Sequence, residues 1–221
     1  FAYLIDKILY LIYNKFDNLC FKVNPTPFKL FNISDLIDCD VINVTPKKTK
    51  YTDKIIEKDI SKIQSYKLDV IIRFGFKILI GEILKSSKYG VWSFHHGDSK
   101  YYRGKPASMW EVLENTPVTG TVLQILSEDL DGGLVISKSY SLTSDISVNR
   151  NRFSQYWKSK NLIIHSLKNL SIYGDSFIND IKNKNALPLF YFKELYRPPG
   201  NFRLLHLISL LFFKKLLSSL K

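Results

Sequence analysis

The chain has 221 residues, of which 45% are hydrophobic and 24% are charged, so it can bury a core and does not have the composition of a disordered protein. Its formal net charge of +12 favours anionic partners, but the lysines are scattered and no recognised nucleic-acid motif accompanies them. We therefore interpret the charge as a solvated basic surface. Cys20 and Cys39 lack the spacing of zinc ligands, which predicts two reduced, partly buried thiols and a cytoplasmic protein.

Predicted helices and strands alternate through the first half of the chain. Apolar residues at helical spacing predict amphipathic helices over 2–19, 53–66, 77–86 and 106–114. Short β-branched or apolar runs predict strands over 40–44, 69–74 and 90–94. This alternation indicates an α/β fold with a mostly parallel sheet, in which sites form at the carboxyl ends of strands. His95 lies at such an end.

The second half is expected to contain strands over 121–126 and 134–142 around a turn at 130–133, then a long helix over 147–172. Pro198, Pro199 and Gly200 mark a break, and the apolar segment beyond them is too short and too interrupted for a comfortable membrane span. Three interpretations stay open for this tail: a helix packed on the domain, contact with a partner or another domain, or contact with a membrane surface. We predict a domain over 1–172 and a helical tail or the start of another region over 173–221.

Two segments carry the chemistry. The first, Ser93–Gly104, reads SFHHGDSKYYRG, and the second, Thr119–Gly133, contains Thr-Gly near its start and Leu-Asp-Gly-Gly at its end. Together they resemble the catalytic domain of folate-dependent formyltransferases, whose pattern is Asn-x-His, Tyr/Trp-Arg-Gly, Thr-Gly-Val-Thr and Gly-Leu-Asp-x-Gly. The match needs no gap between Ser93 and Gly133, and a wider resemblance covers about residues 38 to 170.

The resemblance implies a Rossmann-like formyltransferase domain that uses 10-formyltetrahydrofolate as formyl donor and no metal. It implies that the first strand of the family's fold is missing before Phe1. Catalytic roles fall on His95, Asp131 and Ser93, with Ser93 at the position of the family's Asn. Folate-binding roles fall on Phe74, Gly75, Phe76, Asp129 and Gly133, and acceptor-binding roles on His96, Tyr102 and Arg103. From the residues alone, Asp131 is typical of a turn former and Arg103 of a structural ion pair.

Formyl transfer requires an amine to attack a carbonyl carbon, so a donor must stabilise the resulting oxyanion and a base must remove the amine proton. Histidine titrates near neutrality and suits the proton transfer. Ser93 offers a hydroxyl on a shorter arm than the family's amide, and losing one oxyanion donor typically costs about 2.7–4 kcal/mol. A non-catalytic binding module and a formyltetrahydrofolate hydrolase therefore stay as alternatives. We expect the acceptor to be a small amine rather than tRNA. Within that class we favour an amino sugar, and in particular a nucleotide-linked one.

Overall fold

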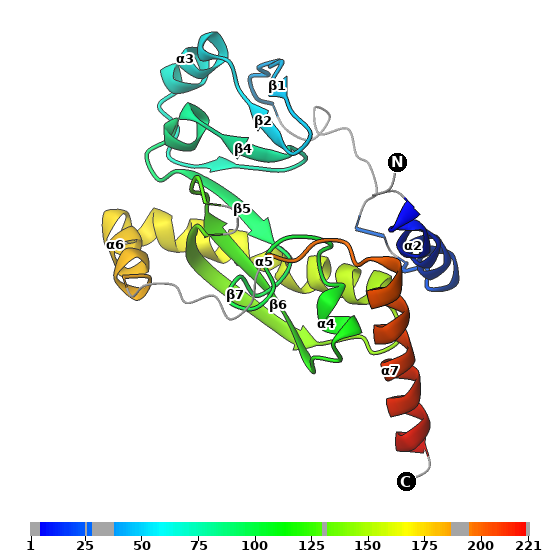
Figure 1. The fold of residues 1–221 in the computed structure, drawn as a ribbon. Coiled ribbons are helices and arrows are strands. Elements are labelled where there is room, and N and C mark those ends of the chain that lie inside the picture. The colour runs from blue at the N-terminus through cyan, green and yellow to red at the C-terminus, as the bar shows by residue number, and fades with distance from the viewer. Residues whose placement is uncertain (1–4, 25, 28–37, 130–131, 187–194, 220–221) are drawn as a thin grey trace.

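The computed structural model describes residues 5–24, 26–27, 38–129, 132–186 and 195–219. Figure 1 shows a small lobe that contains α3 (Glu57–Ser65) beside a larger body crossed by the long helix α5 (Val148–Tyr173). Two sheets, one in each part, and the helices around them confirm the predicted α/β class. The predicted catalytic segment lies in the larger body, and the chain passes through the small lobe on both sides of β3 (Ile71–Ile72).

The small lobe is built on a sheet with the order β1 (Lys47–Lys48), β2 (Thr52–Lys54) and β4 (Ile78–Ile80). β2 and β4 are parallel, and β1 pairs antiparallel to β2. A 3-10 helix, η2 (Glu82–Lys85), follows β4. The lobe closes over a core of buried side chains, which are Ile55, Ile60, Leu79, Ile83, Leu84 and Val91.

The larger sheet has the order β3, β5 (Val91–His95), β6 (Val118–Ile125) and β7 (Leu134–Leu142). β3 and β5 are parallel, whereas β5–β6 and β6–β7 are antiparallel. The expectation of a mostly parallel sheet is therefore wrong for the described strands, which form two parallel and three antiparallel pairs. Connection length explains two of the three antiparallel pairs, because the segments between β1 and β2 and between β6 and β7 can reverse the chain but are too short for a crossover.

α5 and α6 (Asp175–Lys184) cover one face of this sheet. Ser147 caps the start of α5, and its hydroxyl oxygen accepts a hydrogen bond from the Arg150 amide at 3.1 Å. The core between sheet and helices contains Trp92, Leu123, Leu170, Ile178 and Ile181. At its N-terminal half, however, α5 meets the sheet through buried polar side chains, which are Asn151, Gln155 and Ser159.

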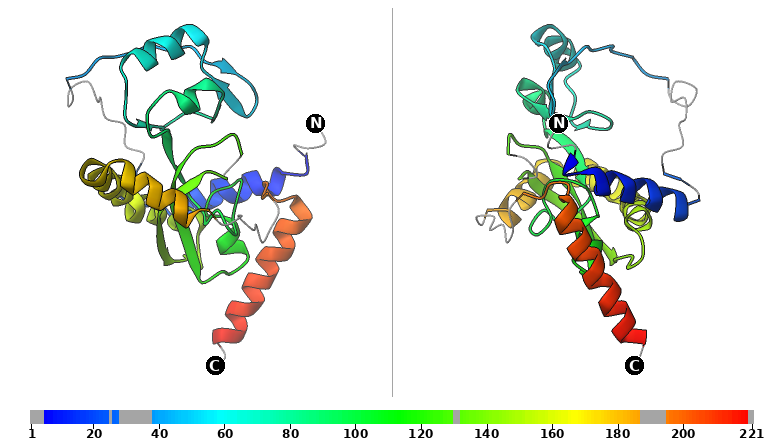
Figure 2. Two further views of the ribbon diagram at one scale, coloured as in Figure 1. Left: turned by 90° about the vertical axis from the view of Figure 1, so that its left-hand side faces the viewer. Right: turned by 45° about the vertical axis from the view of Figure 1, so that its right-hand side comes forward.

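A third core joins α2 (Ile8–Cys20), α4 (Trp110–Leu113) and α7 (Asn201–Ser219) through buried Met109, Val112, Leu113, Val148 and Leu204. α7 therefore packs on the domain by the face that carries Leu204 and Leu207, while Phe202 is 86% exposed. Figure 2 shows the far end of α7 projecting away from the body. No helix in the described ranges is long and apolar enough to cross a membrane.

Several predicted elements differ from the observed ones. Residues 40–44 form no strand, and the predicted helix over 77–86 is β4 followed by η2, because the apolar run Ile78–Ile80 pairs with β2. The helix predicted at the start is present, but its residues Ile8, Leu11, Ile12 and Phe16 are exposed rather than buried. Cys20 and Cys39 are free and exposed, so the prediction of partial burial is wrong for both.

Leu123 tests whether the larger core stabilises the fold. Its side chain is fully buried, so we expect Leu123→Ala to lower the free energy of unfolding by about 2–5 kcal/mol in urea denaturation. The matched control is Leu142→Ala on the neighbouring strand, where Leu142 is 79% exposed and the change should stay within about 0.5 kcal/mol. Equal losses from both variants would contradict the assignment of this core.

Candidate active site

Strand β5 places Ser93 and His95 on one face. Side chains alternate along a strand, so residues two apart point the same way, and both residues are buried, Ser93 at 2% and His95 at 8% exposure. The opposite face carries Trp92, which is fully buried against the α5 side of the sheet. The sheet thus brings two of the three predicted catalytic residues together, at the carboxyl end of β5.

His95 is held by the loop that follows it. Its ring nitrogen Nε2 lies 2.7 Å from the main-chain oxygen of Tyr102. A carbonyl can only accept, so Nε2 carries the proton and Nδ1 is the basic nitrogen of the neutral ring. Gly97 makes this approach possible, because a Cβ there would lie 2.7 Å from the Tyr102 oxygen and 3.0 Å from Nε2.

Ser93 is bound by an arginine from the neighbouring strand. The Nη1 atom of Arg73 donates to Ser93 Oγ at 3.0 Å, and its Nη2 donates to the main-chain oxygens of Phe76 and, at 2.8 Å, Lys77. Ser93 Oγ therefore accepts from a cation, and its own hydroxyl makes only a long contact of 3.4 Å to the Phe94 oxygen. Among the described residues, the Ser93 hydroxyl proton is therefore held only by this long bond.

The same arginine shapes the loop predicted to bind folate. Arg73 bonds back to the main chain at Lys77 and so fixes the loop 73–77, which follows β3 directly. The same side chain bonds Ser93, so Arg73 links this loop, with Phe74, Gly75 and Phe76, to Ser93. Phe74 is 66% exposed, Gly75 has a φ of 76°, and Phe76 packs on the core of the small lobe. Phe74 is therefore the one of the three that presents an aromatic face to solvent.

The third predicted catalytic residue, Asp131, lies outside the described residues, so its pairing with His95 stays a prediction. Its loop begins after Ile125, which pairs with Trp92, whereas His95 pairs with Val122 further along β5. Asp129 in this loop is exposed. Gly133 packs tightly on the sheet, since a Cβ there would lie 2.0 Å from the Ile125 oxygen.

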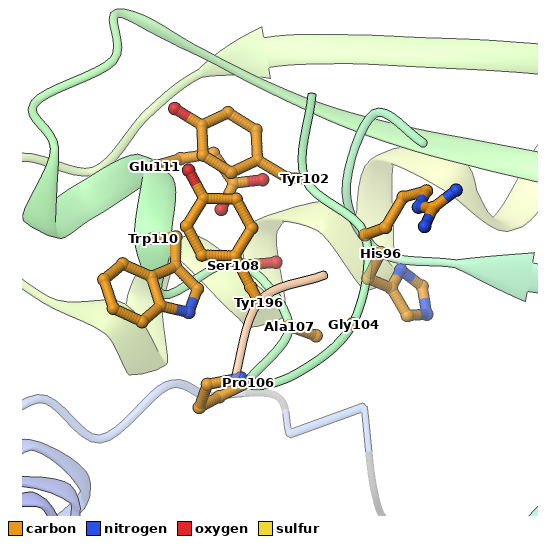
Figure 3. Close-up of a pocket in the computed structure, with 10 residues that line it drawn as sticks. His96, Tyr102, Gly104, Pro106, Ala107, Ser108, Trp110, Glu111 and Tyr196 are labelled. Atoms are coloured by element: carbon orange, nitrogen blue, oxygen red, sulfur yellow. The ribbon is translucent and has the colours of Figure 1, made fainter. Parts of the chain in front are cut away.

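The three predicted acceptor-binding residues, His96, Tyr102 and Arg103, line one cavity that lies after β5 in the chain. Figure 3 shows Trp110, Tyr196 and Tyr102 along one side of it and His96 on the other. The Tyr196 ring lies 4.8 Å from the Trp110 ring and 5.4 Å from the Tyr102 ring. The cavity holds only about 10 Å³, room for about one water molecule, so an acceptor would have to displace part of this aromatic wall.

His96 is kept neutral by its surroundings. Burial lowers its pKa to about 3, and the nearby His95 and Arg152 add repulsion against a second positive charge. Its ring packs edge-on against Tyr156 of α5 at 4.0 Å, and its Nδ1 has no hydrogen-bond partner among the described residues. A neutral imidazole with an unused nitrogen can bind a polar ligand group without bringing charge to it.

No set of three His, Cys, Asp or Glu side chains in the described ranges is arranged to hold a metal ion. His95, His96 and Asp98 are close in sequence, but each has a different environment. His95 contacts the Tyr102 oxygen, His96 packs on α5, and Asp98 binds Lys138 and Tyr140 of β7.

Sequence reasoning did not assign roles to Arg73 or Asp98. Arg73 ends a predicted strand, but only the parallel pairing of β3 with β5 shows that it reaches Ser93. Part of the Asp98 contact could be predicted from the sequence. Lys138 and Tyr140 are two residues apart, so they share one face of a strand and offer two hydrogen-bond donors to an acidic side chain. Neither contact follows from spacing alone.

Comparison with known proteins identifies related sequences. A methionyl-tRNA formyltransferase from Prochlorococcus marinus is 30% identical over 129 residues, which cover 58% of this chain and 37% of the relative. The enzyme of the same name from Bacillus subtilis is 32% identical over 94 residues, covering 42% and 28%. The chain therefore spans about a third of the length of these curated relatives. No model of a known protein family matches the chain.

Among solved structures, HypX from Aquifex aeolicus in complex with tetrahydrofolic acid aligns with 62% of this chain and 22% of its own, at 20% identity and a TM-score of 0.44. The resemblance to folate-dependent formyltransferases that the motifs predicted is confirmed by the sequence relatives.

The neutral state of His96 predicts a pH dependence of stability. The folded imidazole has a pKa of about 3, whereas the unfolded one has the ordinary value of 6.5, so protons bind the unfolded chain first. His96 thus has no effect above pH 6.5 and lowers stability from there down to about pH 3, by at most about 1.4 kcal/mol per pH unit.

We therefore expect His96→Gln to lose less unfolding free energy than the wild type as pH falls from 6.5 towards 4, measured by urea denaturation at each pH. His165→Gln is the matched control, because His165 is exposed on α5. Identical pH profiles for the wild type and His96→Gln would contradict a neutral, buried His96.

Proposed function

We propose that this chain transfers a formyl group from 10-formyltetrahydrofolate to an amine. The observation that carries the proposal is the pairing of Ser93 and His95 on one buried face of β5, in a segment that resembles the formyltransferase motif. The sequence similarity to methionyl-tRNA formyltransferases supports the reaction class. The folate would lie against the loop that presents Phe74, next to Ser93.

In this mechanism the amine nitrogen attacks the formyl carbon and forms a tetrahedral intermediate with a negative oxygen. The Ser93 hydroxyl, which accepts from the Arg73 cation, donates a hydrogen bond to that oxygen. His95 takes a proton from the attacking amine and returns one to the folate nitrogen as the carbon–nitrogen bond to folate breaks. Asp131, by the resemblance, stabilises the imidazolium that forms between these steps.

For the acceptor we propose a small amine that carries an anionic group, with a nucleotide-linked amino sugar as the first candidate. Arg103 and His96 line the same cavity, and a guanidinium suits phosphate oxygens. The relatives are named for methionyl-tRNA, so charged methionyl-tRNA is the comparison acceptor. We further propose a cytoplasmic location, in agreement with the free Cys20 and Cys39.

A second candidate is a non-catalytic module that binds the same ligands. Two observations favour it: Ser93 replaces the longer amide donor of the family pattern, and the cavity beside His96 holds only about 10 Å³. A hydrolase that transfers the formyl group to water is the third candidate. The same assay separates all three, because only the transferase needs an amine and only the module releases no tetrahydrofolate.

The first prediction concerns His95. Tetrahydrofolate release from 10-formyltetrahydrofolate, followed with a panel of nucleotide-linked amino sugars and charged methionyl-tRNA, should depend on one acceptor and fall by about 10²–10⁴ in His95→Gln. His165→Gln, a change of the same kind on the exposed side of α5, should retain the wild-type rate. Full activity of His95→Gln would rule out the assigned mechanism, and release without any acceptor would indicate a hydrolase.

The second prediction concerns Ser93. Ser93→Ala removes the oxyanion donor and should lower kcat by roughly 10²–10³. Ser93→Asn should not raise kcat, because the site is almost fully buried and a longer side chain displaces Arg73. Ser159→Ala is the control for losing a buried serine hydroxyl, since Ser159 bonds to a main-chain oxygen within α5. A higher kcat in Ser93→Asn would show that the serine is a weakened donor and would contradict a site rebuilt around Ser93 and Arg73.

A further inference from the structure

Asp98 ties the loop after β5 to a distant strand. Its side chain is buried at 7% exposure, and Oδ1 accepts hydrogen bonds from Lys138 Nζ at 3.1 Å and the Lys100 amide at 3.0 Å. Oδ2 accepts from the Tyr140 hydroxyl at 2.7 Å. Burial alone would raise the pKa of Asp98, but the bonds from Tyr140, Lys100 and Lys138 together lower it, so the carboxylate stays charged. A buried charge with these partners is fixed in place.

The same residue closes the turn that leads to Tyr102. The main-chain oxygen of Asp98 accepts from the amides of Tyr101 at 2.9 Å and Tyr102 at 2.7 Å. Gly120 on β6 allows the close approach, since a Cβ there would lie 3.0 Å from the Asp98 Cβ. A side chain at this position would therefore crowd Asp98, and the glycine of the Thr-Gly motif favours the contact.

The turn ends at the carbonyl that contacts His95. The Tyr102 oxygen lies 2.7 Å from His95 Nε2, so the position of this oxygen decides which ring nitrogen carries the proton. Asp98 is thus linked to His95 through one turn of main chain, and β7 is linked to both through Lys138 and Tyr140.

We propose that Asp98 is a positioning residue that, through the Tyr102 carbonyl, holds His95 in the Nε2–H tautomer. His95 Nδ1 is then the nitrogen that accepts the proton from the attacking amine. This last step rests on the proposed function, whereas the tautomer itself does not depend on any ligand or activity.

The test is ¹⁵N NMR of the full chain labelled at histidine, at about pH 8, where an ordinary imidazole is neutral. The His95 signals are assigned by their loss in His95→Gln. We expect the wild type to show one dominant Nε2–H tautomer, Asp98→Ala to show a mixture of both, and Asp98→Asn to restore the wild-type pattern. Asparagine can restore it because its amide still accepts from Lys100 and can bond to Tyr140.

Asp175→Ala is a matched control, because it also removes an aspartate that is bonded to a tyrosine hydroxyl and a lysine. Asp175 accepts from the Tyr89 hydroxyl at 2.7 Å and pairs with Lys88 at 3.3 Å, but it lies at the start of α6. This variant should leave the His95 tautomer unchanged.

A folded Asp98→Ala variant with the wild-type tautomer would overturn the proposal. If Asp98→Ala does not fold, Tyr140→Phe removes the shortest bond to the carboxylate and should shift the tautomer in the same direction, and an unchanged spectrum would again overturn it. A chain whose tautomer responds but which releases no tetrahydrofolate retains the positioning role and loses the proposed function. If turnover needs His95 but the tautomer does not change in Asp98→Ala, the proposed function stands and the positioning role of Asp98 is overturned.

Discussion

The antiparallel pairing of β5, β6 and β7 is the constraint on which the candidate site depends. The register sets His95 opposite Val122 and Gly120 opposite Tyr140, so the loop after His95 returns across β6 towards β7. Gly120 favours the hydrogen bond between Tyr140 and Asp98, because a Cβ there would lie 3.0 Å from the Asp98 Cβ and crowd both residues. A slip of one residue would turn every side chain of β6 to the other face and remove that opening.

The register itself is held by polar contacts on the helix side. Thr119 and Thr121 of β6 are fully buried. Thr119 bonds to Asn151 of α5, and Thr121 bonds to Gln155 of the same helix. Gln155 also donates to the Ser141 hydroxyl of β7 at 2.6 Å. Buried polar groups are costly unless satisfied, so these hydrogen bonds favour one alignment over its neighbours. An all-apolar interface would bury as much surface but would tolerate a shifted strand more readily.

The sequence predicted the parts of the structure that depend on local pattern. The β5 strand with His95 at its end, the β7 strand and the α5 helix follow from periodicity, and the site roles that the motif gives to Ser93, His95 and the glycines stay predictions. Strand direction and the role of Arg73 depend on which segments become neighbours, which periodicity does not encode. The run at Ile78–Ile80 shows the same limit, because a short apolar segment suits a helix or a strand until β2 pairs with it.

The exchange of an amide for a serine at position 93 is best understood together with Arg73. A guanidinium from the parallel strand donates to the serine and also bonds the loop that follows β3. One cation thereby contacts the Ser93 hydroxyl and fixes the segment that presents Phe74, so the proposed donor to the oxyanion and one side of the proposed folate site share a single support. A serine without such a partner would be a simple loss of the amide donor, whereas a serine bonded by Arg73 at 3.0 Å supports the proposal that the site is rebuilt around it.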